Sequence, residues 1–192
     1  MNTNTGKFVS FIKSQLENLG LDVHKPALIR TPERAQRAFE ELTRFHTHKD
    51  QIEKHFVFFP SSGSHQLVVV APIFFGSLCE HHLLPFFGFV SIGYIPNGKI
   101  LGLSKFKRII ELVTKQVIIQ ERLTKEIFDL FTSRLNPKGL VVMLEAKHTC
   151  VLFRGVKDGH SVVKTLMKSQ FFNEHATELQ TFFQMIQNHE KP

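Results

Sequence analysis

The sequence has little cysteine, almost no aromatic residue other than phenylalanine, and no long hydrophobic run. It contains two Cys, one Tyr and no Trp, against 20 Phe. No run approaches the ~18 apolar residues that a membrane-spanning helix needs, so we expect no membrane partner. The first seven residues include no apolar segment, which predicts that no signal peptide is present. Two cysteines without such a leader indicate a reducing compartment, and we expect a cytoplasmic protein whose thiols are free for metal.

The chain does contain enough apolar residues for one domain with a hydrophobic core. They make up 42% of its 192 residues, which is typical of a globular protein and argues against disorder. The formal net charge of +7 favours an anionic partner such as a nucleic acid, a nucleotide or a phosphorylated metabolite. Because the basic residues are spread along the chain, we expect no nucleic-acid partner.

Helical spacing of apolar residues predicts an N-terminal helical segment over residues 1–46, followed by the main domain over residues 47–192. The first helix covers residues 8–19 and stops at Gly20. The second begins with Thr31 as the N-cap and Pro32 at the first helical position, and ends near Phe45. Residues 46–65 show no regular pattern.

The main domain reads as strands at both ends with two helices between them. We expect strands over residues 66–75 and 87–95, and a tight turn at Pro96-Asn97-Gly98-Lys99. Helices follow from a Ser104 cap and over residues 121–135, and then strands over residues 140–146 and 149–156. The tail, residues 173–189, is predicted to be helical. The order β-β-α-α-β-β indicates an α+β sheet with helices on one face.

Both cysteines lie beside histidines, in Cys79-Glu80-His81-His82 and in His148-Thr149-Cys150. Two Cys and one His leave the fourth position of a tetrahedral zinc ion to water, which is the pattern of a catalytic site. His81 would then lie next to the metal, free to transfer protons. On a strand, His148 and Cys150 would face the same side. Buried thiols, a disulfide or ordinary histidines are alternatives that the spacing leaves open.

A possible anion site lies at the start of the first central helix. Ser104, Lys105 and Arg108 place backbone amides and two cations at one helix N-terminus, where cations alone oppose the helix dipole. A solvated charge run is the alternative. Arg154 and Arg34 could add charge from other elements.

Gln120 and Glu121 open the second central helix, where an acidic residue suits the helix dipole. A carboxylate can also accept hydrogen bonds from a ring N–H and an exocyclic amine together, a geometry that suits guanine. Capping and recognition of a purine edge both remain possible from the residues alone.

Taken together, these segments closely resemble the GTP cyclohydrolase I family, in the family's order and spacing from about residue 30 to residue 156. The motifs are TPER at 31–34, SLCEHHLLPFFG at 77–88, YIPNG at 94–98, ILGLSK at 100–105, QERLT at 120–124, NPKG at 136–139 and HTC at 148–150, followed by Arg154-Gly155. The resemblance implies a tunnelling fold in which subunits join their sheets into a barrel, and a homodecamer of two pentamers. It also implies conversion of GTP and water to 7,8-dihydroneopterin triphosphate and formate, the first step of tetrahydrofolate and pterin biosynthesis.

The resemblance assigns a role to each candidate residue. The family's Zn²⁺ (zinc) ligands match Cys79, His82 and Cys150, and its proton-transferring histidines match His81 and His148. The remaining matches are to substrate-binding residues: Gln120 and Glu121 for the guanine edge, Ser104 near the ribose and phosphates, and Lys105, Arg108, Arg154 and Arg34 for the triphosphate.

Residues 161–170 depart from the family's usual Ser/Thr-rich segment, notably at Leu166 and Gln170, and this affects the expected local packing. Two alternative functions compete with the family's own. One is a related tunnelling-fold enzyme that acts on another pterin or a deazapurine. The other is a nucleic-acid-binding module with a structural zinc, which would need a fourth protein ligand and a continuous basic face.

Overall fold

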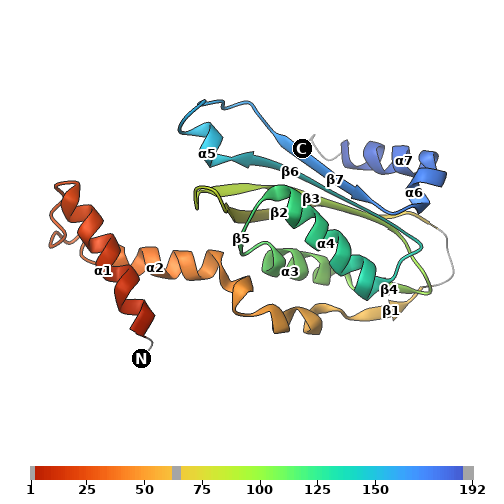
Figure 1. The fold of residues 1–192 in the computed structure, drawn as a ribbon. Coiled ribbons are helices and arrows are strands. Elements are labelled where there is room, and N and C mark those ends of the chain that lie inside the picture. The colour runs from red at the N-terminus through yellow and green to blue at the C-terminus, as the bar shows by residue number, and fades with distance from the viewer. Residues whose placement is uncertain (1–2, 62–65, 188–192) are drawn as a thin grey trace.

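The computed structural model describes residues 3–61 and 66–187 and contains a five-stranded sheet of order β5-β2-β3-β6-β7 (Figure 1). Its long central strands are β2 (Val68–Cys79), β3 (Pro85–Ile95) and β6 (Gly139–His148), which pair antiparallel. The edges are β7 (Val163–Lys168), antiparallel to β6, and the short β5 (Val117–Ile118), parallel to β2. A separate two-stranded ribbon pairs β1 (Phe58–Pro60) with β4 (Lys99–Leu101).

Alternation along the strands gives the sheet two apolar faces. One face packs on α3 (Leu103–Val113) and α4 (Gln120–Leu135), and its core includes Phe86, Val142 and Phe106. On the opposite face, Val141 is buried with Phe172 of α6 (Phe171–Glu174) and Phe182 of α7 (Ala176–Gln187). The expectation that helices cover only one face is therefore wrong. Successive side chains of β6 point to opposite faces of the sheet and are apolar on both, so each face needs a covering layer.

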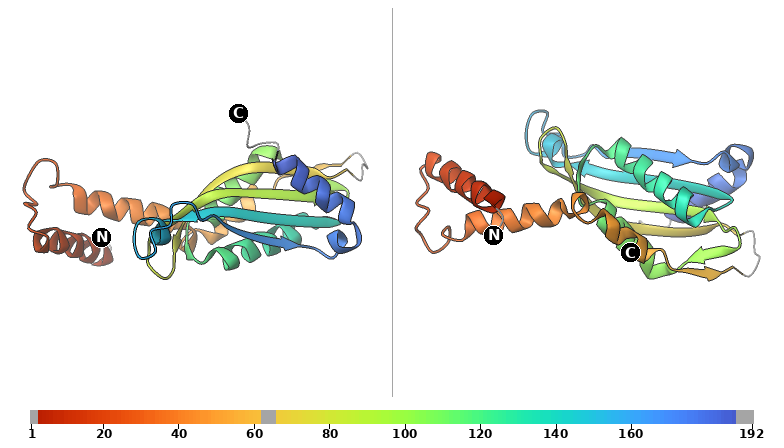
Figure 2. Two further views of the ribbon diagram at one scale, coloured as in Figure 1. Left: turned by 90° about the horizontal axis from the view of Figure 1, so that it is seen from above. Right: turned by 60° about the horizontal axis from the view of Figure 1, so that its bottom comes forward.

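The N-terminal helices form an arm that extends away from the sheet in every view (Figures 1 and 2). They are α1 (Thr3–Asn18) and α2 (Thr31–Leu42), joined through Gly20, whose φ is +75°. Phe8 and Phe39 stack between them at 5.5 Å between ring centroids. Two 3₁₀ segments, η1 (Arg44–His46) and η2 (Lys49–His55), then lead the chain back to α3 and β1. No helix in the described ranges is both long enough and apolar enough to cross a membrane.

The main error of the sequence prediction concerns residues 149–156. They form not a strand but the short helix α5 (Thr149–Leu152) and a turn at Gly155, whose φ is +61°. The edge strand is β7, inside the atypical segment 161–170. Its side chains are mostly exposed, so β7 lacks the strong apolar alternation on which a sequence prediction depends.

The predicted helix starts also need correction. Helix α2 already includes Thr31, and α3 begins at Leu103 after Gly102, so neither Thr31 nor Ser104 is the N-cap, and neither helix has a side-chain cap bond. Helix α2 ends at Leu42, before the 3₁₀ turns, and the segment predicted as irregular contains η2 and β1. The C-terminal helix α7 is described as far as Gln187; the last two residues predicted for it lie outside the described residues.

The close approach of β3 and β6 generates a prediction about Gly88. A Cβ at this position would overlap the carbonyl oxygen of Glu145 and lie 2.8 Å from the Cα of Ala146. Backbone cannot move aside as a flexible side chain can, so Gly88→Ala should lower the free energy of unfolding by about 3 kcal/mol. Urea denaturation followed by circular dichroism measures this change.

Gly76→Ala on β2 is the matched control, because its added Cβ meets only the Cβ of Phe87, at 4.0 Å. It should change stability by no more than about 1 kcal/mol. Equal midpoints for the two variants would contradict the packing described here.

Candidate metal centre and active site

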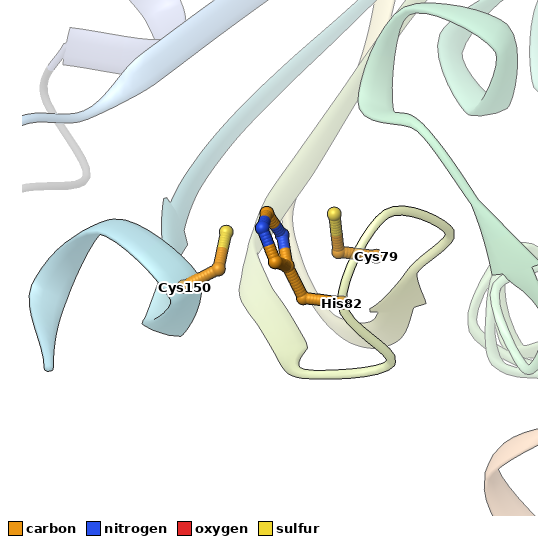
Figure 3. Close-up of side chains that lie close together, drawn as sticks. All are labelled: Cys79, His82 and Cys150. Atoms are coloured by element: carbon orange, nitrogen blue, oxygen red, sulfur yellow. The ribbon is translucent and has the colours of Figure 1, made fainter. Parts of the chain in front are cut away.

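Three side chains at one end of the sheet form a cluster that could hold a metal ion. The ligand atoms of Cys79, His82 and Cys150 lie within 4.8 Å of one another (Figure 3). Cys79 is the last residue of β2 and is buried; His82 lies in the turn to β3, and Cys150 lies on α5. Two thiols and an imidazole are the donor types that zinc prefers.

Backbone hydrogen bonds position the loop that carries two of these side chains. The amides of His82 and Leu83 both donate to the Cys79 carbonyl, and the Cys79 amide donates to the Leu84 carbonyl at 2.9 Å. Leu83 adopts a left-handed conformation with φ 54°, which turns the chain into β3. His81 stays beside the cluster, with its Nδ1 3.8 Å from Cys79 Sγ.

A single side-chain bond holds α5 against this loop. Thr149 Oγ1 donates to the Pro85 carbonyl at 2.6 Å, which ties the start of α5 to the start of β3. Cys150 therefore reaches the cluster from a helical turn, and the expected strand alternation of His148 and Cys150 is wrong. Burial, and then the neighbouring Cys79, raises the pKa of the Cys150 thiol. Two thiolates this close repel each other, and a cation bound between them would offset that repulsion and lower the thiol pKa.

His148, the last residue of β6, is held in one orientation from two sides. Its ring stacks on Phe86 with 4.8 Å between centroids, and its Nε2 lies 2.9 Å from Gln120 Oε1. The Gln120 amide nitrogen donates to the carbonyls of Leu144 and Val163, at 3.2 and 3.0 Å. Since carbonyls only accept, Gln120 must present its oxygen to His148, so Nε2 of His148 carries the proton and Nδ1 is left free.

This arrangement changes the interpretation of Gln120. Gln120 is 1% exposed, and its side chain is committed to contacts within the fold; its contact with a purine stays a prediction. Its amide positions His148. Burial lowers the pKa of His148, and the nearby Glu121 carboxylate partly opposes that shift. Glu121 is exposed at the start of α4, where a ligand can reach it.

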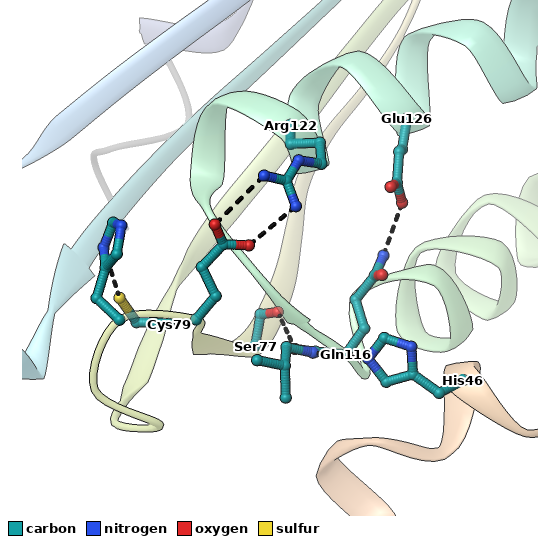
Figure 4. Close-up of polar contacts among 9 residues, drawn as sticks. His46, Ser77, Cys79, Gln116, Arg122 and Glu126 are labelled. Atoms are coloured by element: carbon teal, nitrogen blue, oxygen red, sulfur yellow. Dashed lines mark hydrogen bonds and ion pairs between the residues drawn. The ribbon is translucent and has the colours of Figure 1, made fainter.

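An ion pair that the sequence reasoning missed connects α4 to the loop that carries Cys79 and His82. Arg122 donates two hydrogen bonds to Glu80, at 2.9 and 3.3 Å (Figure 4). Because Glu80 follows Cys79 and Arg122 follows Glu121, the pair links the start of α4 to the loop that carries Cys79 and His82. The sequence showed an acidic residue in one motif and a basic residue in the other, but no pattern indicated that the two motifs lie in contact.

A second network supports the end of β2 from below (Figure 4). Ser77 Oγ and the Leu78 amide both donate to the Gln116 carbonyl, at 2.8 and 3.0 Å. The Gln116 amide in turn donates to Glu126 at 2.9 Å, and the Val117 amide donates to His46 Nε2 at 3.1 Å. The network joins η1, β5 and α4 to the strand that ends in Cys79.

Of the predicted cations, only Arg154 lies near the cluster. It follows α5 in an exposed turn, and its charge opposes the rise in the pKa of Cys150. The same turn exposes Phe153 and Val156, which are 78% and 83% accessible. Arg34 is on α2, where its guanidinium donates to the carbonyls of Arg30 and Ala27 at 3.2 and 3.3 Å.

Ser104, Lys105 and Arg108 lie on the first turns of α3, toward the opposite end of the sheet. Helix α3 follows β4 at the Ile95 end of β3 and runs back to β5, which pairs with Cys79. One chain therefore brings together seven candidate side chains and Arg154, but not the cations of α2 and α3. The side chains brought together are Cys79, His81, His82, Gln120, Glu121, His148 and Cys150.

Comparison of the sequence with known proteins identifies a family. The family model described as GTP cyclohydrolase I matches residues 8–187. The GTP cyclohydrolase 1 of Methylococcus capsulatus is 40% identical over 89% of this chain and 92% of its own length. That of Chlorobium chlorochromatii is 38% identical over 95% of this chain and 82% of its own.

A third relative, the GTP cyclohydrolase 1 of Campylobacter jejuni, is 38% identical over 94% of both chains. Among solved structures, the archaeosine synthase QueF-Like in the apo form aligns with 55% of this chain and 95% of that one, at 21% identity and a TM-score of 0.45. That structural similarity is too low to argue from, whereas the family match spans nearly the whole sequence. The chain belongs to the GTP cyclohydrolase I family.

Proposed function

We propose that this protein is a zinc-dependent GTP cyclohydrolase I that converts GTP and water to 7,8-dihydroneopterin triphosphate and formate. The observation that carries the proposal is the meeting of a Cys-His-Cys cluster, two further histidines and Glu121 at one end of the sheet, in a chain of this family. The two unpaired thiols suit a reducing compartment such as the cytoplasm.

The cluster fits zinc through its donor set. Cys79, His82 and Cys150 would hold the ion and leave one tetrahedral position open. Bound there, zinc would supply Lewis acidity and lower the pKa of a water molecule toward neutrality. The Glu80–Arg122 pair and the Thr149 bond to Pro85 would keep the three ligands in place.

The chain's own residues would orient the purine and move protons. The Glu121 carboxylate would accept hydrogen bonds from the guanine ring N–H and the exocyclic amine. His148 would accept and return a proton at Nδ1, because its Nε2–H is committed to Gln120. Its lowered pKa keeps the ring neutral near pH 7, so it begins as a base. His81, next to Cys79, would serve as the second proton carrier.

The position of the cations expected to bind the triphosphate supports an active site that is shared between subunits. Ser104, Lys105 and Arg108 lie away from the cluster within one chain, so we propose that a neighbouring subunit supplies them. Strand β7 pairs only with β6 in the five-stranded sheet, and its outer edge offers backbone groups to another chain. A homodecamer of two pentamers, with the tunnelling-fold domains of residues 47–192 joined into a barrel and the helical segments of residues 1–46 outside it, would complete each site.

The first prediction tests the reaction itself. Purified protein loaded with zinc and incubated with GTP should release formate and give a product that becomes fluorescent neopterin after oxidation and dephosphorylation. A folded, zinc-loaded protein that yields no pterin would contradict the proposal. Turnover of another purine or pterin, with GTP untouched, would favour the related tunnelling-fold enzyme.

The second prediction separates metal binding from proton transfer. The wild type should bind about one zinc per chain, and Cys150→Ala should bind almost none, as measured by mass spectrometry of dialysed protein. His148→Ala should keep its zinc and lose about 10²- to 10⁴-fold in kcat. Zinc retained by Cys150→Ala at the wild-type level would show that the cluster is not the metal site.

The third prediction tests sharing of the site. His148→Ala and Lys105→Ala homo-oligomers should each be nearly inactive. Mixed oligomers formed by co-expression should regain activity, because random pairing at equal amounts makes about a quarter of the sites intact. Mixed oligomers without recovered activity would place both residues in a site made by one chain.

A further inference from the structure

A pocket between α3 and the 3₁₀ segments adjoins the proposed triphosphate cations but is lined mostly by residues not yet given a role. Its volume is about 320 Å³, and its lining includes Arg44, His48, Lys54, His55, Arg108 and Glu111. This volume is at the lower end of the ~300–1,000 Å³ typical of ligand pockets. Of these residues, only Arg108 was singled out from the sequence. Arg44 lies on η1, Glu111 lies on the next turn of α3, and His48, Lys54 and His55 come from the segment that showed no regular pattern.

The pocket carries positive charge that the chain itself does not neutralise. Glu111 is the one acidic residue of the lining, and it already pairs with Arg44 at 3.2 Å. Among the described residues, Lys54 donates only to the neutral side-chain amide of Gln51, at 3.3 Å. Within residues 3–61 and 66–187, no carboxylate forms an ion pair with Lys105 or Arg108. A cationic, partly enclosed pocket is a site for an anion.

The pKa of His55 shows that several of these cations lie close to one another. Its pKa is lowered first by burial and then by the charges of Lys54, Lys105 and Arg108. Lys54 is the neighbouring residue on η2, and the other two lie on successive turns of α3, so positive charge surrounds this imidazole from two elements. An anion placed among them would offset the repulsion and allow the ring to become a charged donor.

We propose that this pocket receives the terminal phosphates of the substrate's triphosphate, with Lys54 and His55 as phosphate-binding residues that favour a triphosphate over shorter phosphate chains. The inference rests on the proposed function. Arg108 connects the two regions, because it lines the pocket and lies one turn after Lys105 at the start of α3. A phosphate chain that begins at the helix N-terminus would therefore extend along α3 toward η2.

The direct test uses inorganic tripolyphosphate and pyrophosphate as probes of the full-length oligomer, by isothermal titration calorimetry at low ionic strength. Lys54→Gln and His55→Gln should each weaken tripolyphosphate binding about three- to tenfold and raise the KM for GTP similarly, with kcat little changed. Pyrophosphate has a shorter chain, which we expect not to reach past Arg108, so its affinity should fall less in these two variants. The matched control is Lys49→Gln, which removes the same charge from η2 outside the pocket lining.

The proton balance gives a second readout that a merely structural role would not change. The charged groups that face His55 are Lys54 on η2 and Lys105 and Arg108 on α3; the Arg44–Glu111 pair and the titratable His48 complete the lining. Because the anion raises the lowered pKa of His55, binding near pH 6.5 should take up protons, and His55→Gln should abolish that uptake. Titrations in buffers of different ionisation enthalpy measure it.

The two hypotheses fail separately. No pterin from GTP with the wild type would overturn the proposed function. Pterin formation by the wild type, with tripolyphosphate affinity and KM unchanged in both pocket variants and no proton uptake, would overturn only the assignment of Lys54 and His55. Equal losses in Lys49→Gln would also overturn it, since they would show an effect of net charge alone.

Discussion

The buried amide of Gln120 is the interaction on which the candidate site depends most. One side chain, from the first residue of α4, bonds to β6 through Leu144, to β7 through Val163 and Thr165, and to His148. A buried carbonyl left without a partner costs about 1–3 kcal/mol, so the amide has little freedom to turn. The helix start, the last two strands and the imidazole are therefore held in one arrangement, and the orientation of His148 follows from the fold itself.

The Cys79, His82 and Cys150 cluster depends on a different constraint, the meeting of three short segments. Cys79 ends a strand, His82 lies in a turn closed on the Cys79 carbonyl, and Cys150 lies on a helix tied to Pro85. None of these segments could place its side chain alone. The Glu80–Arg122 pair extends the same arrangement to Glu121. Its geometry is bidentate, which makes it more specific than a single surface ion pair.

Much of the fold follows from local pattern, and the failures have physical causes. Alternation predicted β2, β3 and β6, and helical spacing predicted α1, α3 and α4, because long elements bury one or both faces. The segment after His148 was assigned to a strand because it is apolar, but the Thr149 bond and the turn at Gly155 make it helical and then irregular. Strand β7 is an exposed edge strand, so its sequence lacks the apolar alternation that a buried face produces.

The candidate site was predictable only where neighbours in sequence are neighbours in space. The pairing of cysteines with histidines marked the cluster, but no sequence pattern showed that the Gln120 side chain is buried and bonded to β7. The pocket residues Lys54 and His55 come from 3₁₀ turns, which have no strong periodicity to recognise. Contacts between distant segments, such as Glu80 with Arg122, depend on the assembled sheet and leave no local pattern.

The turn after α5 has a consequence for how the protein matures. Cys150 is separated by only a few residues from Phe153 and Val156, two of the most exposed apolar side chains in the described chain. If a neighbouring chain covered these apolar residues, a ligand held at Cys150 would already restrict the turn, and the ordering entropy would be lost once for both events. In an assembly that buries the turn, metal affinity and subunit affinity are reciprocally linked, so each would strengthen the other by the same factor.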